Sequence, residues 1–199
     1  MTTLSDIGPL SRSGDDTVDA LLAEGPHWNL LKPAPGNTLY YTFADTGAHS
    51  GAVSGVSPFN GPQQAAARQA VTYVSEVTGI TFRETADPRE AHIGFYNGDI
   101  LLGPSISGQA YWSNSYSYSG DEVTSYEVSA SIYLDDNEFA AANSNPSPGG
   151  QGYETLLHEF GHALGLKHPF EGSPPLTVAE DNTNNTIMSY THAGDYKST

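Results

Sequence analysis

The sequence contains no cysteine. Disulfide bonds, thiolate metal sites and a cysteine nucleophile are therefore excluded. Any bound metal ion has to be held by histidine or carboxylate side chains, and the chain has seven histidines. Methionine is also scarce: besides Met1 there is only Met188.

Basic residues are few as well, because seven Lys and Arg face 23 Asp and Glu, for a formal net charge of -16. A surface this negative repels phosphate backbones and anionic lipid headgroups. No apolar run approaches the roughly 18 residues of a membrane span, and the first residues lack the basic start and apolar core of a signal peptide. We therefore expect neither nucleic acid nor a membrane among the partners.

A length of 199 residues predicts one domain, here taken as residues 1–199. Apolar spacing and turn signals predict helices near 15–24, 60–78 and 153–164, with Val18 and Val77 on the buried stripes of the first two. Strands are expected at 38–43, 80–84, 91–96, 107–113 and 128–134, and a Gly/Ser-rich loop at 47–57. Because strands and helices mix and the last third is loop-rich, the fold class is α+β (mixed α/β).

The segment from His158 to His168 carries the chemistry. On a helix, His158 and His162 are about 40° apart, so both imidazoles can reach one metal ion from adjacent turns. Glu159 lies beside them, close enough to contact a water on that ion. The apolar residues of the same helix occupy the opposite arc, which leaves the ligand face to a cleft.

Two helical histidines leave zinc undercoordinated. Gly165 can take the left-handed conformation that ends a helix, and the chain then turns to bring His168 to the same ion. Three neutral imidazoles and one open position are typical of a catalytic zinc site. Zinc lowers the pKa of a bound water to about 7, and Glu159 can accept that proton while the water attacks a carbonyl, which is the chemistry of peptide hydrolysis.

The motif from His158 to His168 resembles the extended zinc motif of the metzincin metalloproteases. Met188, within Ile187-Met188-Ser189-Tyr190, matches the methionine turn of that family, which forms an apolar floor under the zinc ligands. The resemblance assigns Tyr190 two roles: a further zinc ligand in the resting enzyme, and a hydrogen-bond donor to the reaction intermediate. Pro169 and the stretch Ala179-Glu180-Asp181 are similar to the serralysin branch.

The resemblance covers most of the chain and implies a twisted mixed sheet with an antiparallel edge strand, two long helices and an irregular C-terminal lobe. The upper lobe would comprise about 1–165 and the lower lobe about 166–199. The segment Gln109-Ala110-Tyr111-Trp112 sits where the family places the edge strand that binds substrate main chain. The implied protein is a secreted, extracellular, monomeric zinc endopeptidase that acts on extended protein or peptide segments, with a proteinaceous inhibitor as a further partner left open.

Two alternatives stay open at this point. One is a catalytically silent module that keeps the fold and grips peptides by the edge strand; the other is a structural zinc domain with four protein ligands. Serralysins continue into a calcium-binding β-roll, whereas this sequence ends nine residues after Tyr190. We therefore expect either a catalytic fragment or a member without the roll, and calcium dependence is in doubt.

Two weaker groups complete the candidates. The run Asp135-Asp136-Asn137-Glu138 offers oxygen ligands for calcium, but it lacks the spacing of a dedicated loop, and a turn at the end of a strand is favoured. Four histidines lack ligand spacing and are expected to be structural or exposed, with His192 the one nearest the cleft: His27, His49, His92 and His192.

Overall fold

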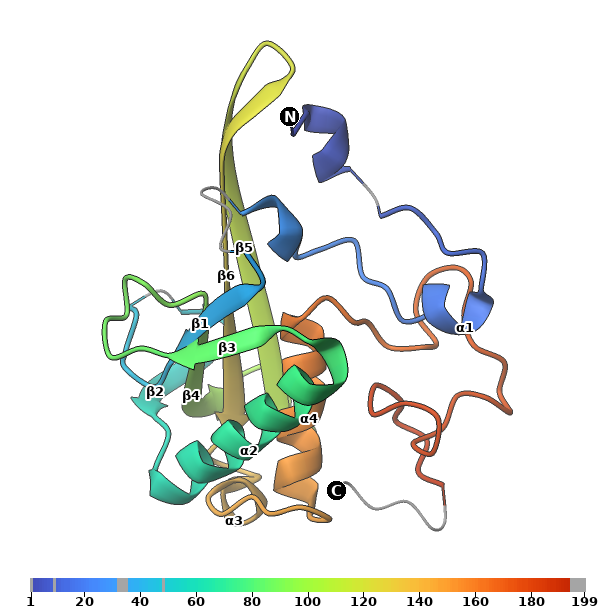
Figure 1. Ribbon diagram of the computed structural model, residues 1–199. Coiled ribbons are helices and arrows are strands. Elements are labelled where there is room, and N and C mark those ends of the chain that lie inside the picture. Colours follow the sequence, from blue (N-terminus) through green and yellow to red (C-terminus); the bar gives the residue numbers. More distant parts are fainter. Residues whose placement is uncertain (1, 9, 32–35, 48, 194–199) are drawn as a thin grey trace.

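The computed structural model describes residues 2–8, 10–31, 36–47 and 49–193 (Figure 1). Its α-helices are α1 Asp16–Asp19, α2 Gly61–Thr78, α3 Ala140–Asn143 and α4 Gln151–Ala163, and two short 3-10 helices span Leu4–Ile7 and Trp28–Leu30. Its strands are β1 Thr38–Thr42, β2 Val53–Pro58, β3 Thr81–Glu84, β4 Ile93–Ile100, β5 Gly108–Ser119 and β6 Glu122–Asp135.

The six strands form one mixed sheet in the order β3-β1-β4-β6-β5, with β2 paired to β4 beside this path. The strands β3, β1, β4 and β6 are parallel to their neighbours, whereas β2 is antiparallel to β4 and β5 is antiparallel to β6. The expected mixed α/β class, with an antiparallel strand at the edge, is confirmed.

Both long helices pack on the same face of the sheet. Alternation along β4 places Ile93 and Phe95 in the main core, where they meet residues of α2 and α4. Tyr96 points to the opposite face and packs with Tyr133 in a smaller cluster. The main core therefore holds α4, the helix of the zinc motif, rigidly against the sheet.

The helix α2 begins and ends as its sequence predicts. Asn60 and Gln63 form a reciprocal capping box, and Gly79 closes the helix in the left-handed conformation. The predicted buried stripe of α2 extended too far, however, because Val77, which the sequence placed on it, is 63% exposed. Val77 lies in the last turn of α2, next to its C-terminal end at Thr78.

The first helix is much shorter than predicted. It is capped by Asp15, as expected, but α1 ends at Asp19, and Val18 is 45% exposed. The segment that follows leaves the helical path because its backbone pairs with the C-terminal part of the chain: Ala23 N–H donates to the Gly165 carbonyl, and Lys167 N–H to the Leu21 carbonyl. Tertiary pairing thus overrides the local helical pattern.

The loop predicted at 47–57 is also wrong in part, since β2 occupies Val53–Pro58. Its Ser and Gly residues have low strand propensity. β2 pairs with the end of β4, beyond the point where β1 has ended, so the free edge of β4 decides its conformation.

The edge strand is longer than its predicted seven residues. β5 and β6 form a hairpin that projects beyond the rest of the sheet (Figure 1). The N-terminal segment pairs with the tip of this hairpin, where Leu4 N–H donates to the Asp121 carbonyl and Val123 N–H to the Thr2 carbonyl. Backbone pairing with β6 along its whole length explains why the Ser/Tyr-rich β5 is ordered as a strand.

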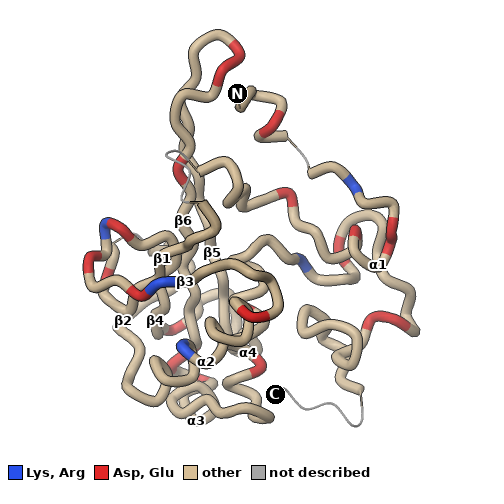
Figure 2. Tube along the Cα trace, viewed as in Figure 1, with Lys and Arg blue, Asp and Glu red and all other residues tan. Residues whose placement is uncertain are grey.

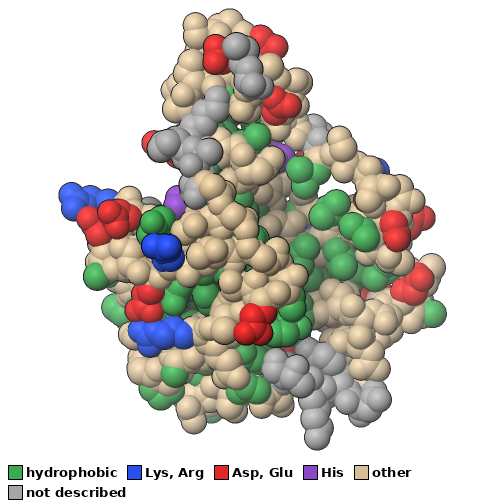
Figure 3. Space-filling model, viewed as in Figure 1, with side chains coloured by type: hydrophobic (Ala, Val, Ile, Leu, Met, Phe, Trp, Pro, Cys, Tyr) green, Lys and Arg blue, Asp and Glu red, His purple; other side chains and the backbone are tan. Residues whose placement is uncertain are grey.

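Beyond α4 the described chain is irregular, as predicted for the lower lobe, and the last six residues of that lobe lie outside the described part. The N-terminal and C-terminal segments lie side by side, with hydrophobic side chains visible between them and the central body (Figure 3). No helix among the described residues is long and apolar enough to cross a bilayer.

Gly152 sets how closely α4 approaches α3. A Cβ at this position would clash with the backbone oxygen of Ala142. We expect Gly152→Ala to lower the free energy of unfolding by about 2 kcal/mol, although alanine is the better helix former. Chemical denaturation measures this, with Gly61→Ala as the control because its Cβ meets open space. Equal stability of the two variants would contradict the close packing.

Candidate active site

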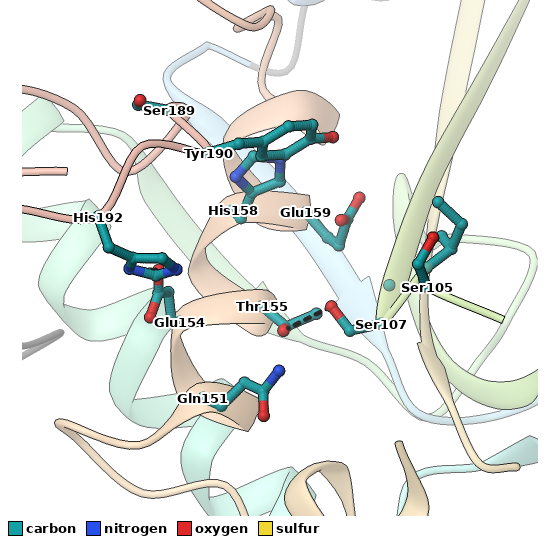
Figure 4. Close-up of a pocket in the computed structure, with 12 residues that line it drawn as sticks. Ser105, Ser107, Gln151, Glu154, Thr155, His158, Glu159, Ser189, Tyr190 and His192 are labelled. Carbon is teal, nitrogen blue, oxygen red and sulfur yellow. Dashed lines mark hydrogen bonds and ion pairs between the residues drawn. The ribbon is translucent and has the colours of Figure 1, made fainter. Parts of the chain in front are cut away.

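α4 presents imidazole and carboxylate groups on the face that borders a cleft. His158 and Glu159 are both buried in the helix face and project toward β5 and the C-terminal segment (Figure 4). His162 follows one turn later. On the opposite arc, Phe160 is buried in the main core, so packing of the apolar side fixes the direction of the ligand side.

A glycine turn carries the third histidine to the same place. Gly165 has φ +103°, the left-handed conformation. Its N–H donates to the His162 carbonyl, and the Leu166 N–H donates to the Gly161 carbonyl, each at 3.0 Å. This pair of bonds is the Schellman motif, which satisfies the last carbonyls of the helix and reverses the chain. His168 is thereby returned to the helix face.

The three imidazoles converge on one point. Each Nε2 atom of His158, His162 and His168 lies 3.1 Å from the other two. A tetrahedral zinc ion with Zn–N distances of about 2.0–2.1 Å requires nitrogens roughly 3.3 Å apart. The triangle therefore fits zinc with only a small expansion.

The outer ring nitrogens establish which atoms are available as ligands. The acceptors of the Nδ1–H groups are the Ile187 carbonyl for His158 at 2.8 Å, the Leu166 carbonyl for His162 at 2.9 Å and the Glu171 carboxylate for His168 at 2.8 Å. Neither a carbonyl nor an ionised carboxylate can donate a hydrogen bond. In each of the three rings, Nδ1 therefore carries the proton and Nε2 a lone pair. Three lone pairs directed at one point repel each other unless they share a cation, which makes this donor set a candidate metal site.

Burial keeps these rings in the form that binds metal. It lowers the pKa of His158 to about 4 and shifts the pKa of His162 in the same direction. Protonated imidazole cannot act as a ligand. Both rings are therefore neutral at pH 7.

Met188, which the resemblance assigns to the methionine turn, packs against α4 at Gly161. It is completely buried, and its Sδ would be 2.6 Å from a Cβ placed on Gly161. The absence of a side chain at Gly161 is what lets the sulfur approach α4. The turn is held by the Met188 N–H, which donates to Thr186 Oγ1, and by the Ser189 hydroxyl, which donates to Asp181.

Tyr190 stands over the histidines on the solvent side. Its ring stacks on His158, with centroids 5.6 Å apart, and lies 4.5 Å from the ring of His168 (Figure 4). Burial, together with the charges of Glu159 and Glu171, raises the pKa of its phenol. The hydroxyl is thus retained as a hydrogen-bond donor at neutral pH.

Glu159 bridges α4 and the edge strand. Its carboxylate accepts a hydrogen bond from the Ala110 N–H, and burial raises its pKa to about 8. A Cβ on Gly108 would lie 2.7 Å from Glu159 Cγ, so this glycine makes the close approach of β5 possible.

The outer edge of β5 faces this carboxylate. Asp135 N–H donates to the Ser107 carbonyl, and the register then pairs Gln109 with Tyr133 and Tyr111 with Ser131. Because bonded and non-bonded pairs alternate, the backbone groups of Gly108, Ala110 and Trp112 point away from β6.

The side chains of the predicted substrate strand have different positions. The Tyr111 ring is exposed, whereas the Trp112 ring packs against Gly25 of the N-terminal segment. Gln109 Oε1 is buried without a hydrogen-bond partner among the described residues. Of Trp112, therefore, the backbone but not the packed ring is available at the strand edge.

A cavity of about 390 Å³ adjoins the metal site. His158, Glu159 and Tyr190 line it next to the histidine triangle; Gln151, Glu154, Thr155 and His192 line the part further along α4 (Figure 4). The open metal position, the buried carboxylate and the strand edge therefore meet in one concave space, the arrangement expected of a hydrolase.

Comparison with known proteins is consistent with this geometry. The family model of matrixin peptidases matches residues 59–185. The chain belongs to the matrixin family. Among its relatives, metalloprotease AprA of Pseudomonas entomophila is 30% identical over 194 residues, which cover 92% of this chain and 38% of that protein. Serralysin of Photorhabdus laumondii is 31% identical over 148 residues, or 69% of this chain and 28% of the relative.

These matches confirm the resemblance to the serralysin-type metzincins drawn from the motif. The chain spans less than two fifths of the length of the relatives described above. The matrixin match ends at residue 185, before Met188 and Tyr190, so the methionine turn stays a prediction.

Glu171 is a site residue of this matrixin-family chain that sequence reasoning missed. It follows His168 by three positions, and a carboxylate so close to a predicted ligand is a signal that could have found it. Carboxylates in this position orient a metal-binding histidine and raise its basicity.

We expect Glu171→Gln to weaken zinc binding about 10-fold to 100-fold, because the amide bonds the His168 ring less strongly than a carboxylate does. Competition with a zinc chelator of known affinity measures this. Glu180→Gln, in the same irregular segment, is the control and should bind zinc as the wild type does. Unchanged affinity in Glu171→Gln would remove Glu171 from the site.

The remaining candidates have structural roles in this matrixin-family fold. The Asp135 carboxylate accepts N–H groups from Ile100, Asn137 and Phe139, as a residue that closes a strand-end turn should. Asp99 and Glu138 approach Asp135, with all three carboxylates within 4.8 Å of one another. The backbone bonds already account for the burial of Asp135, so calcium remains unsupported.

The four other histidines also differ in position. His27 is buried, His49 contacts Asp45 and Tyr133, and the His92 ring accepts the Tyr40 N–H. His192 lines the cavity, where the sequence had placed it nearest to the cleft.

Proposed function

We propose that this chain is the catalytic part of a secreted zinc endopeptidase of serralysin type. The observation that carries the proposal is the triangle of three Nε2 lone pairs beside the buried Glu159 carboxylate, at the open edge of β5. The similarity to AprA and serralysins supports the peptidase class and suggests a location outside the cell.

Zinc, when held by His158, His162 and His168, would supply a Lewis acid and lower the pKa of a water molecule. Glu159 accepts the proton of that water at a carboxylate oxygen while the water oxygen bonds to the scissile carbonyl carbon. It then delivers the proton to the leaving amine as the C–N bond breaks, so the carboxylate is regenerated. Burial raises the pKa of Glu159 to about 8, which favours the protonated form that delivers the proton to the leaving amine.

The β5 edge would hold the substrate in place. An extended peptide can add to the sheet through the outward backbone groups of Gly108, Ala110 and Trp112, leaving its side chains free. The Ala110 N–H would be released from Glu159 to do so. Main-chain recognition by the segment 109–112 fits an endopeptidase of broad range.

Tyr190 would donate its phenolic proton in a hydrogen bond to the oxyanion that develops on the scissile carbonyl. We expect Tyr190→Phe to lower kcat about 100-fold while zinc content changes little, because the other ligands are retained. Steady-state kinetics and metal analysis of the same preparation measure both. Parallel loss of zinc and activity would instead make Tyr190 a structural ligand.

The decisive experiment is cleavage of a peptide library, analysed by mass spectrometry, with zinc, with chelator and after zinc is restored. Cleavage that disappears and returns supports the proposal. Peptide binding without cleavage in the zinc-loaded protein would establish the silent binding module instead. A fourth protein ligand and no exchangeable water would establish a structural zinc site.

A further inference from the structure

The direction of a bound peptide determines which part of the cavity each substrate residue meets. A peptide that lies antiparallel to β5 runs from the Trp112 end of the edge toward the Gly108 end. The Glu159 carboxylate, which marks the cleaved bond, lies at Ala110. Substrate residues after the cleaved bond therefore extend toward Ser105–Gly108, which line the cavity.

Glu154 lies in this part of the cavity. It precedes His158 by one helical turn, so both side chains project from the same face of α4. The separation along the helix axis is roughly 6 Å, a span that the four-carbon stem of lysine or the stem of arginine can cover. Figure 4 shows Glu154 beyond His158, on the side of His192.

The walls around Glu154 are mostly polar, and no Lys or Arg lies among the described residues that line them. Ser105, Ser107, Gln151 and Thr155 supply hydroxyl and amide groups, and Glu154 supplies the carboxylate in this part of the cavity. α4 has no Lys or Arg along its length (Figure 2). A negative field favours a cation in the cavity and disfavours an acidic side chain.

We propose that Glu154 selects lysine or arginine as the first substrate residue after the cleaved bond. The proposal rests on the proposed peptidase function and adds a substrate class to it. A cationic side chain that enters along α4 forms a charge-assisted hydrogen bond with the Glu154 carboxylate, while its stem passes Thr155 and Ile106.

The state of Glu154 in the structure supports this assignment. Its side chain is only 22% exposed, and burial raises its pKa, whereas the charge of His192 acts in the opposite direction. The nearest His192 nitrogen, Nδ1, lies 3.6 Å from the carboxylate, longer than a normal hydrogen bond. A substrate ammonium or guanidinium group would supply the close donor that compensates this partly buried charge.

The test compares cleavage of two libraries by wild type, Glu154→Gln and Glu154→Lys, with Glu76→Gln on the exposed side of α2 as the matched control. One library randomises the residue after the cleaved bond and the other the residue before it. We expect wild type and Glu76→Gln to prefer Lys and Arg over Gln by roughly tenfold after the bond. Glu154→Gln should lose that preference, and Glu154→Lys should reverse it toward Asp and Glu.

A binding measurement keeps the test independent of turnover. In the Glu159→Ala background, a peptide with lysine after the intended bond should bind about tenfold more tightly than its norleucine counterpart, and Glu154→Gln should abolish the difference. Cleavage without any basic preference, or a preference that survives Glu154→Gln, would overturn the proposal while leaving the peptidase intact. A basic preference before the bond would overturn the antiparallel direction. Absence of all cleavage would count against the proposed function itself.

Discussion

Glu159→Ala is expected to retain zinc and to cleave peptides roughly a thousandfold more slowly than wild type. The proposed zinc ligands are His158, His162 and His168, and none of their outer hydrogen bonds described above involves Glu159. The carboxylate instead lies between α4 and β5, where it accepts a hydrogen bond from the Ala110 N–H. Its removal therefore deletes the proton acceptor and leaves the metal site assembled.

Zinc content and casein cleavage should be measured on the same preparation. Glu159→Gln is a useful second variant, because the amide fills the same space between β5 and α4 but cannot accept the proton. Glu76→Gln controls for loss of a surface charge. Near-normal casein cleavage by zinc-loaded Glu159→Ala would remove Glu159 from the mechanism.

Zinc removal is expected to lower the melting temperature by about 8–16 °C. A ligand present at a thousand times its dissociation constant stabilises the folded state by about 4 kcal/mol, and each kcal/mol shifts the melting temperature of a domain this size by about 2–4 °C. The structural reason is the triangle of lone pairs 3.1 Å apart, which is unfavourable without a cation and links α4 to the irregular segment that follows it.

Calorimetry of the same sample with zinc, after chelation and after zinc is restored would measure this stabilisation. His162→Ala is the matched variant: it should melt near the temperature of the chelated wild type and respond little to added zinc. A wild-type melting temperature that does not change with zinc would show that the three histidines do not hold the ion in solution.

The parts of the site that lie on one helix could be predicted from the sequence. Periodicity alone places His158 and His162 on one face, and Gly165 explains the return of His168. These are local relations, fixed by helical geometry and by the left-handed freedom of glycine. The fold class and the edge position of β5 were predicted too.

Other parts depend on contacts between distant segments, and local patterns do not encode them. β2 forms because β4 has a free edge, although Gly55 and Pro58 within it have low strand propensity. α1 stops early because the chain after it pairs with residues 165–167. Gly161 and Gly108 have no role that spacing reveals, since each matters only for the side chain that lies against it.

The pairing of the N-terminal segment has a consequence for the order of folding. Lys167, next to the third histidine, donates its ammonium group to the carbonyl of Ala20, 147 positions away in the sequence. The indole N–H of Trp28 likewise bonds the carbonyl of Ala163, 135 positions away. Contacts of such separation form slowly, because a long loop must close first. His168 is therefore fixed late, and the proposed metal site is complete only when the beginning of the chain has reached the segment after α4.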